Sequence, residues 1–212
     1  MPAAVCPADR EANMRHILVA VTGASGSIYG LRLAGELLHA GCRVSLLLSE
    51  SGRQVLNYET GLEWSADPGE RQNQVRAHFA GGEVACLDNR DLFHAVASGS
   101  SAPDAMVICP CSMGTAGRIA AGLGETLLQR AADVMLKEHR PLLLVPRETP
   151  LSVIHLENLL RLARAGARVI PAMPGFYHNP QSVDDLVAFM VGKVLDQLGV
   201  DHRLFRRWGG EG

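Results

Sequence analysis

The chain has 212 residues and a formal net charge of −2 at pH 7. This length suits one domain with a single hydrophobic core better than two domains. The near-neutral charge gives no electrostatic reason to expect binding to nucleic acid or to an anionic membrane. Since the sequence contains no run of about 18 apolar residues, it also predicts no membrane-spanning helix.

The cysteines and the N-terminal segment indicate the compartment. The cysteines are five in number and have no Cys-x-x-Cys spacing, and Cys109 and Cys111 lack a second Cys or His pair at zinc-finger spacing. We therefore expect reduced thiols, no metal site and a cytoplasmic protein. Residues 1–14 lack the apolar centre of a signal peptide and are interpreted as a disordered leader.

Apolar runs alternate with helical patterns from residue 16 onward. The first run, residues 16–22, predicts a strand that is buried on both faces. A helix over residues 27–40 follows, with a glycine at its C-terminal end, and then a strand over residues 43–48. Residues 60–82 are mostly polar and rich in glycine, so they predict a surface excursion that interrupts the alternation.

The alternation then resumes and continues to the last helix. The pattern predicts strands over residues 83–87, 105–109, 141–145 and 168–170, and helices over residues 115–121, 125–139, 152–165 and 183–198. Strands that alternate with helices form a parallel sheet covered on both faces. Residues 15–200 are therefore predicted to form one three-layer α/β domain, doubly wound in the Rossmann-like or flavodoxin-like manner, with a tail over residues 201–212.

Ligands bind such sheets beyond the carboxyl ends of the strands, so the loops after the strands are candidate sites. The first loop reads Thr22-Gly23-Ala24-Ser25-Gly26-Ser27. Its glycines let the backbone approach a ligand, and the helix that follows favours an anion. A tight turn with Ser25 or Ser27 as the helix cap explains the same residues. Glu50 is placed like the ribose-binding acid of an NAD enzyme, but the glycine spacing is not that of the dinucleotide fingerprint.

Three later segments carry further candidate groups. Pro110-Cys111-Ser112-Met113-Gly114-Thr115 offers hydroxyls and free N–H groups for a phosphate or a flavin edge, or only a helix cap. On the helix over residues 125–139, Arg130 and Lys137 lie off the buried stripe, on a face that is solvated unless another chain covers it. Arg147-Glu148 follows a buried strand and suits either proton transfer or a surface ion pair.

Two features near the C-terminus complete the set. The segment PGFYHNP (residues 174–180) is richer in aromatic residues and prolines than a generic linker, although a packed loop would explain it. Lys193 lies at the edge of the apolar stripe of the last helix, where a lysine stem often only covers apolar surface.

Four long segments occur in order along the chain: VTGASGSIYG (21–30), SGSSAPDAMVICPCS (98–112), RAADVMLKEHRPLLLVPRETP (130–150) and PGFYHNPQSVDDLV (174–187), with a terminal RRWG (206–209). Together they resemble the flavin prenyltransferases of the UbiX-like family, over about residues 16–208. This resemblance, rather than the spacing of any one loop, is the basis of the functional expectation.

The resemblance implies a site that can be assigned residue by residue. It implies that FMN is held by nine residues of the loops after the strands, namely Gly23, Ala24, Ser25, Ser49, Ser112, Met113, Gly114, Thr115 and Arg147. It implies that the phosphate of the prenyl donor is bound by Tyr177, Lys193, Arg130, Lys137 and Glu148, with Glu59 and Trp208 lining the site. A lysine keeps the charge at position 193 but lacks the fork of the arginine that some relatives carry.

The implied reaction joins the dimethylallyl group of dimethylallyl monophosphate to N5 and C6 of reduced FMN without a metal. Lys137, Arg130 and Lys193 would stabilise the charge of the departing phosphate. In the same scheme Glu148 would protonate this phosphate, and Ser25, assisted by Glu59, would relay the proton of ring closure. The product, prenylated FMN, would serve a partner UbiD-type decarboxylase, in ubiquinone biosynthesis or the decarboxylation of aromatic acids.

The resemblance also implies a homo-oligomer, dodecameric in relatives, in which neighbouring chains and the tail over residues 201–212 complete the active site. Three alternatives stay open at this point. The chain could be a non-catalytic FMN-binding accessory subunit of a decarboxylase, a cysteine-decarboxylating flavoprotein or an NAD-binding domain. The second is disfavoured because no asparagine follows Met173 in the loop where those enzymes carry one.

Overall fold

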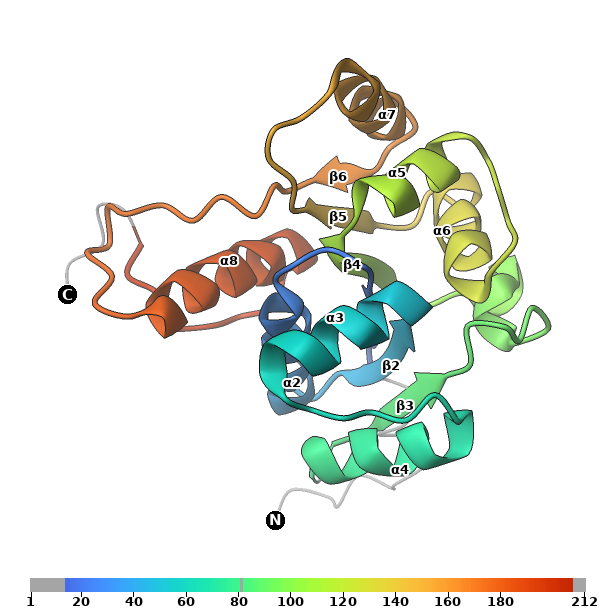
Figure 1. Cartoon of the computed structure of the whole chain (residues 1–212), viewed down its shortest axis with the longest axis horizontal. Coiled ribbons are helices and arrows are strands. Elements are labelled where there is room, and N and C mark those ends of the chain that lie inside the picture. The colour runs from blue at the N-terminus through green and yellow to red at the C-terminus, as the bar shows by residue number, and fades with distance from the viewer. Residues whose placement is uncertain (1–13, 81, 208–212) are drawn as a thin grey trace, which may run out of the picture.

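The computed structural model describes residues 14–80 and 82–207 (Figure 1). The predicted leader, apart from Met14, and the predicted site residue Trp208 lie outside these residues. No helix in the described part of the chain is long and apolar enough to cross a membrane.

One parallel sheet of six strands forms the centre of the domain. Its strand order is β3-β2-β1-β4-β5-β6. The chain builds outward from β1 to β3 and then returns to add β4 on the other side of β1, so the connections diverge between β1 and β4. Ligands bind at this divergence in doubly wound folds. The strand bounds are His16–Val21 (β1), Arg43–Leu48 (β2), Val84–Leu87 (β3), Ala105–Cys111 (β4), Leu142–Pro146 (β5) and Arg168–Val169 (β6).

Helices cover both faces of the sheet, as predicted. One face packs against α2, α3, α4 and α8, and the other packs against α5, α6 and α7 (Figure 1). Their bounds are Ser27–His39 (α2), Glu50–Thr60 (α3), Pro68–His78 (α4), Met113–Ala120 (α5), Leu127–Lys137 (α6), Val153–Arg164 (α7) and Val183–Leu198 (α8). Two short 3-10 turns, Ala95–Ala97 and Gly99–Ser101, precede β4.

The central strands are apolar because they are buried on both sides. In β1, Ile17 and Val19 belong to the core on the α2/α8 side, whereas Leu18 and Ala20 belong to the core on the α5/α6 side. All four side chains have no exposed surface. Side chains of a strand alternate between the two faces of a sheet, so a strand covered on both faces needs apolar residues without interruption.

The expectation for residues 60–82 was wrong in part, because this segment contains α4. Asp67 accepts a hydrogen bond from the N–H of Glu70, and Pro68 occupies the first turn. Both features are helix-start signals that the glycines on either side of them obscured. The helix is polar except where Val75 enters the core, so it lacks the periodic apolar stripe of the other helices.

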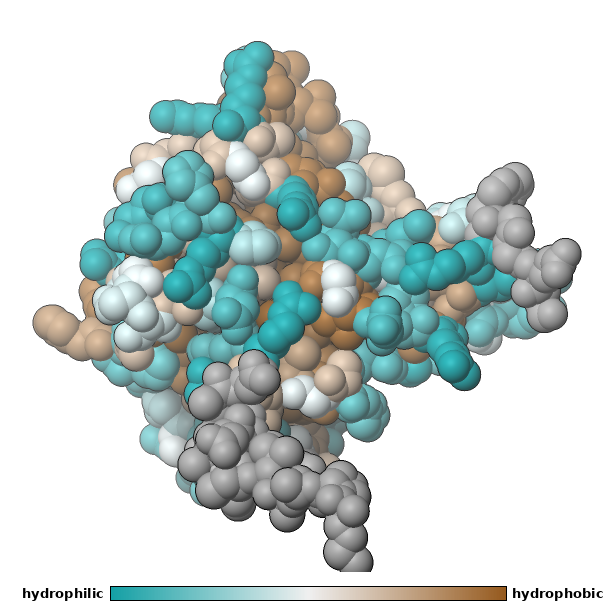
Figure 2. Space-filling model, turned by 180° about the vertical axis from the view of Figure 1, so that it is seen from behind, coloured by the Kyte–Doolittle hydropathy of each residue, from teal (hydrophilic) through white to brown (hydrophobic). Residues whose placement is uncertain are grey.

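Helix α7 has the predicted bounds to within one residue, but its apolar residues are largely exposed. Val153, Ile154, Leu156 and Leu160 keep 50–70% of their surface accessible, and Leu162 is the one buried residue of this helix. Figure 2 shows hydrophobic surface at the end of the molecule that α7 forms. Exposed apolar side chains gathered on one helix are typical of a contact surface.

Candidate active site

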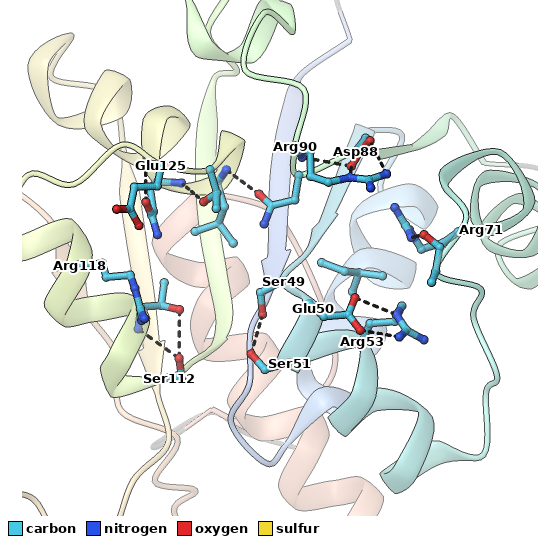
Figure 3. Close-up of a pocket in the computed structure, with 17 residues that line it drawn as sticks. Ser49, Glu50, Ser51, Arg53, Arg71, Asp88, Arg90, Ser112, Arg118 and Glu125 are labelled. Atoms are coloured by element: carbon cyan, nitrogen blue, oxygen red, sulfur yellow. Dashed lines mark hydrogen bonds and ion pairs between the residues drawn. The ribbon is translucent and has the colours of Figure 1, made fainter.

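A cavity of about 580 Å³ lies beyond the carboxyl ends of the central strands (Figure 3). Ser49 and its neighbours after β2 line one side, and Ser112 and Thr115 after β4 line the other. The cavity therefore lies where the strand order predicts a ligand. Nine residues are expected to hold FMN, and three of them line this cavity: Ser49, Ser112 and Thr115.

Two helix N-termini that carry expected FMN ligands face this cavity, and Thr126 at the start of α6 lines it as well. Ser49 caps α3 by accepting a hydrogen bond of 2.9 Å from the N–H of Gly52, and Ser112 caps α5 by accepting one of 3.2 Å from the N–H of Thr115. The start of a helix carries a partial positive charge and free N–H groups. Two such ends that border one cavity make it suited to an anion such as a phosphate.

The turn after β1 is fixed to the loop after β4 by Thr22, a residue of the first candidate loop for which no role of its own was predicted. The hydroxyl of Thr22 donates a hydrogen bond of 2.8 Å to the carbonyl oxygen of Pro110 and accepts one of 2.7 Å from the N–H of Ser112. Thr22 is fully buried. The available signal was its position, a hydroxyl at the end of an apolar strand directly before a glycine.

The glycine and methionine of these loops have packing roles. A Cβ at Gly23 would overlap the hydroxyl of Ser51, so only glycine lets the turn approach the start of α3 this closely. Met113 is 5% exposed and belongs to the core, which leaves its backbone alone available to a ligand. Ala24 is also buried, whereas Gly114 is exposed.

Glu59, from the last turn of α3, occupies the N-terminus of α2. Its carboxylate accepts hydrogen bonds from the N–H groups of Gly26 (3.0 and 3.1 Å) and Ser27 (2.9 Å). Burial disfavours the carboxylate form, but hydrogen bonds from the Ser25 side chain and from these two N–H groups hold the pKa of Glu59 below its usual range. Neither serine caps α2 as the simpler explanation proposed, because the acid does so.

Arg147 joins the same turn from the end of β5. Its Nε donates a hydrogen bond of 3.1 Å to the carbonyl oxygen of Ser25. The adjacent Glu148 is exposed, and its Oε1 accepts a hydrogen bond of 3.0 Å from the N–H of Thr149. The structure thus brings Ser25, Glu59 and Arg147 together, with Glu148 next in the chain.

The basic residues of α6 stay apart from this group within one chain. Arg130 and Lys137 are exposed, and neither lines the cavity. Lys137 pairs with Glu138 across 2.7 Å. The predicted buried stripe of this helix, Leu128, Ala131, Ala132 and Met135, is in the core as expected.

The predicted donor-binding residues near the C-terminus form a third group. The ammonium of Lys193 lies 5.5 Å from the ring centroid of Phe189 and 5.3 Å from that of Phe205. Tyr177 packs edge-on against Phe189 with centroids 5.5 Å apart. Lys193 and Phe189 also line a second cavity of about 580 Å³ beside β6. One aromatic ring therefore supports both Tyr177 and Lys193, away from the first cavity.

The fold and the cavity define an α/β flavoprotein. The sequence model of the family described as Flavoprotein matches residues 6–195. The flavin prenyltransferase UbiX of Alkalihalophilus pseudofirmus is 51% identical over 193 residues, which are 90% of this chain and 94% of that protein. The UbiX of Pseudomonas aeruginosa is 48% identical over 195 residues, 91% and 93% of the two chains. The chain belongs to the UbiX flavin prenyltransferase family.

Solved structures agree with this assignment and confirm the fold. AnUbiX (PadA1), crystallised with FMN and dimethylallyl pyrophosphate, has a TM-score of 0.84 and 38% identity, over 94% of this chain and 100% of that one. A dodecameric FMN-dependent UbiX-like decarboxylase from Escherichia coli O157:H7 has a TM-score of 0.81 and 40% identity, over 92% and 100%. The predicted three-layer doubly wound α/β domain is therefore confirmed.

Proposed function

We propose that the protein transfers the dimethylallyl group of dimethylallyl monophosphate to N5 and C6 of reduced FMN, with release of phosphate. Family membership supports this reaction. The observation that carries it is the junction of Ser25, Glu59 and Arg147 between the turn after β1 and the end of β5. This junction brings together a hydroxyl, an acid and a cation in the turn that precedes α2.

The residues of the first cavity suit the phosphate end of FMN. Ser49, Ser112 and Thr115 offer hydroxyls, and the starts of α3 and α5 offer N–H groups and a favourable field. The Gly23–Ser25 turn and Arg147 border the same region and would hold the rest of the flavin. When bound, the reduced flavin supplies the nucleophilic atoms N5 and C6.

The protein has to stabilise a leaving phosphate and move protons. Lys137, Arg130 and Lys193 supply positive charge for the phosphate as the donor C–O bond breaks, and Glu148 supplies the proton that the phosphate takes. The hydrogen bond between Ser25 and Glu59 creates a path for the proton displaced from C6 when the second bond forms. Hydrogen bonds lower the pKa of Glu59 and keep it ionised, and the ionised carboxylate is the form that can accept this proton.

The three groups of residues meet only if several chains share one active site. The flavin-binding loops, the α6 face and the Tyr177/Lys193 group are separate within one chain, and the exposed apolar side of α7 offers a contact surface. We therefore propose a homo-oligomer, a dodecamer as in the Escherichia coli relative, that acts in the cytoplasm. Its product would pass to a UbiD-type decarboxylase.

The decisive test is anaerobic incubation of the purified protein with reduced FMN and dimethylallyl monophosphate, followed by mass spectrometry of the extracted flavin. The expected product is FMN heavier by one C5H8 unit, formed without any decarboxylase present. A parallel reaction with the pyrophosphate, the donor bound in AnUbiX, defines the donor. Recovery of unmodified FMN with both donors would contradict the proposal and favour a non-catalytic FMN-binding accessory subunit.

A further inference from the structure

Arg71 is a buried cation in the wall of the first cavity. It lies on α4, is 7% exposed and lines the cavity with Ser49 and Ser112 (Figure 3). Its Nη1 donates hydrogen bonds of 3.0 Å to the carbonyl oxygens of Ser65 and Ala66. Its Nε is buried and has no hydrogen-bond partner among the described residues. A buried donor without a partner costs free energy and calls for an explanation.

Two of the neighbouring arginines of the cavity are already paired with acids. Arg53 binds Glu50 across 2.6 Å, and Arg90 binds Asp88 across 3.1 Å. Arg71 has no ion pair within 4 Å in the part of the chain that the structure describes. A buried charge is costly unless an opposite charge compensates it. Arg71 and the exposed Arg118 are therefore the two cations of this wall without an ion pair among the described residues, and Arg71 is the buried one.

Arg71 lies near Glu50 and Asp88 and affects the pKa of each without contacting either. Hydrogen bonds from Arg53 hold the pKa of Glu50 below its usual range, and Arg71 contributes to the same shift. Asp88 is shifted in the same direction by Arg90 first and by Arg71 as well. Arg71 thus lies between the ends of β2 and β3, close to the start of α3. Its charge adds to the field of the two helix N-termini that face the cavity.

We propose that Arg71 binds the phosphate of the flavin, as an additional ligand outside the segments by which the family is recognised. A dianionic phosphate on the cavity side of Arg71 would compensate the charge of the guanidinium. This inference rests on the proposed function for the identity of the ligand. The alternative is a structural role alone, in which Arg71 only fastens residues 65 and 66 to α4.

Riboflavin separates these two roles, because it is FMN without the phosphate. We would titrate the protein with FMN and with riboflavin, following flavin fluorescence, in the wild type and in Arg71→Gln. Glutamine removes the charge and is too short to replace the bonds of Nη1 to Ser65 and Ala66, so riboflavin binding reports any structural effect of losing those bonds. The expected result is FMN binding weaker by roughly tenfold or more, with riboflavin binding unchanged. The matched control is Arg76→Gln, which removes an exposed arginine from the same helix and should change neither affinity.

Equal weakening of both ligands, or unchanged FMN binding, would overturn the proposal. If Arg71→Gln does not fold, Arg71→Lys decides the question, since it keeps the charge but loses the fork. The lysine variant should weaken FMN binding selectively and by a smaller factor, and an unchanged FMN affinity would again contradict a phosphate contact. These titrations contain no prenyl donor. The result for Arg71 would therefore stand even if the protein failed to prenylate FMN.

Discussion

The carboxylate of Glu59, at the end of α3, accepts a hydrogen bond of 2.9 Å from the backbone N–H of Ser27, at the start of α2. The two residues are 32 positions apart, and the contact places the acid in the field of a helix N-terminus. Such a field stabilises the ionised form, in agreement with the lowered pKa of Glu59. The carboxylate is thereby kept ionised and is held in position by backbone donors that do not rotate.

Replacement of Glu59 by glutamine should impair catalysis more than flavin binding. Glutamine is nearly isosteric and can still accept a hydrogen bond, but it cannot take up a proton. We expect Glu59→Gln to slow the formation of prenylated FMN by roughly 100-fold or more, with FMN affinity within about threefold of the wild type. The control Glu63→Gln changes an exposed acid nearby and should leave the rate unchanged. Normal turnover in Glu59→Gln would remove this residue from the proton path.

The same acid should make part of the stability pH-dependent. Its pKa is lower in the folded state than in the unfolded chain, so its contribution is complete above the unfolded-state pKa. The contribution is lost as the pH falls through the lower folded-state pKa. Melting temperatures measured from pH 7 down to the acid limit of folding should therefore fall more steeply in the wild type than in Glu59→Gln. Parallel curves would show that protonation of Glu59 does not change the stability of the fold.

Two glycines of α2 should respond in opposite directions to alanine. A Cβ at Gly30 would overlap the carbonyl oxygen of Cys109 and lie 2.8 Å from Cγ2 of Val21, both in closely packed strands. We expect Gly30→Ala to destabilise the protein by about 1–3 kcal/mol. At Gly35 the new Cβ would meet only the ring of Phe79 within 4 Å among the described residues, at an ordinary contact distance of 3.9 Å. Gly35→Ala should therefore stabilise the helix by about 0.5–1 kcal/mol. Urea unfolding of both variants measures the difference.

The sequence predicts the sheet well because buried parallel strands require unbroken apolar runs, as in residues 16–22. It also predicts that the loops proposed to hold the flavin lie together, because the carboxyl ends of parallel strands share one edge of the sheet. The role of Glu59 as the cap of α2 cannot be read locally, since the acid and the helix start are joined by tertiary packing. The burial of Arg71 was also missed, because α4 has almost no apolar periodicity. Periodicity in α7 predicts an apolar face but does not indicate what covers it.

The exposed apolar face of α7 should be required for assembly. Leu156 is 52% exposed within one chain, so a glutamate there costs the isolated fold little. In an interface, however, it would bury an unpaired charge. We expect Leu156→Glu to lower the molar mass measured by light scattering while circular dichroism stays unchanged. Arg164→Glu, on the same helix, is the control and should preserve the assembly. A full-size assembly of the Leu156 variant would place the interface elsewhere.

Shared active sites make a quantitative prediction for mixed oligomers. One variant combines Arg130→Ala with Lys137→Ala, and a second combines Tyr177→Phe with Lys193→Met. Each alone should lose prenylation, because every site then lacks one set of phosphate ligands. If the two sets come from different chains, random co-assembly leaves both sets intact in about a quarter of the sites. Co-expression of the two variants should therefore restore about a quarter of the wild-type rate.

The control for this experiment carries all four substitutions on one chain and is co-expressed with either double variant. It should restore nothing, because one of the two sets is then absent from every chain. Activity in this control would point to phosphate ligands other than these four residues. If the two double variants assemble together but stay inactive, Arg130 and Lys137 act in the same site as Tyr177 and Lys193 of their own chain. In that case a conformational change on donor binding would have to bring the two groups of one chain together.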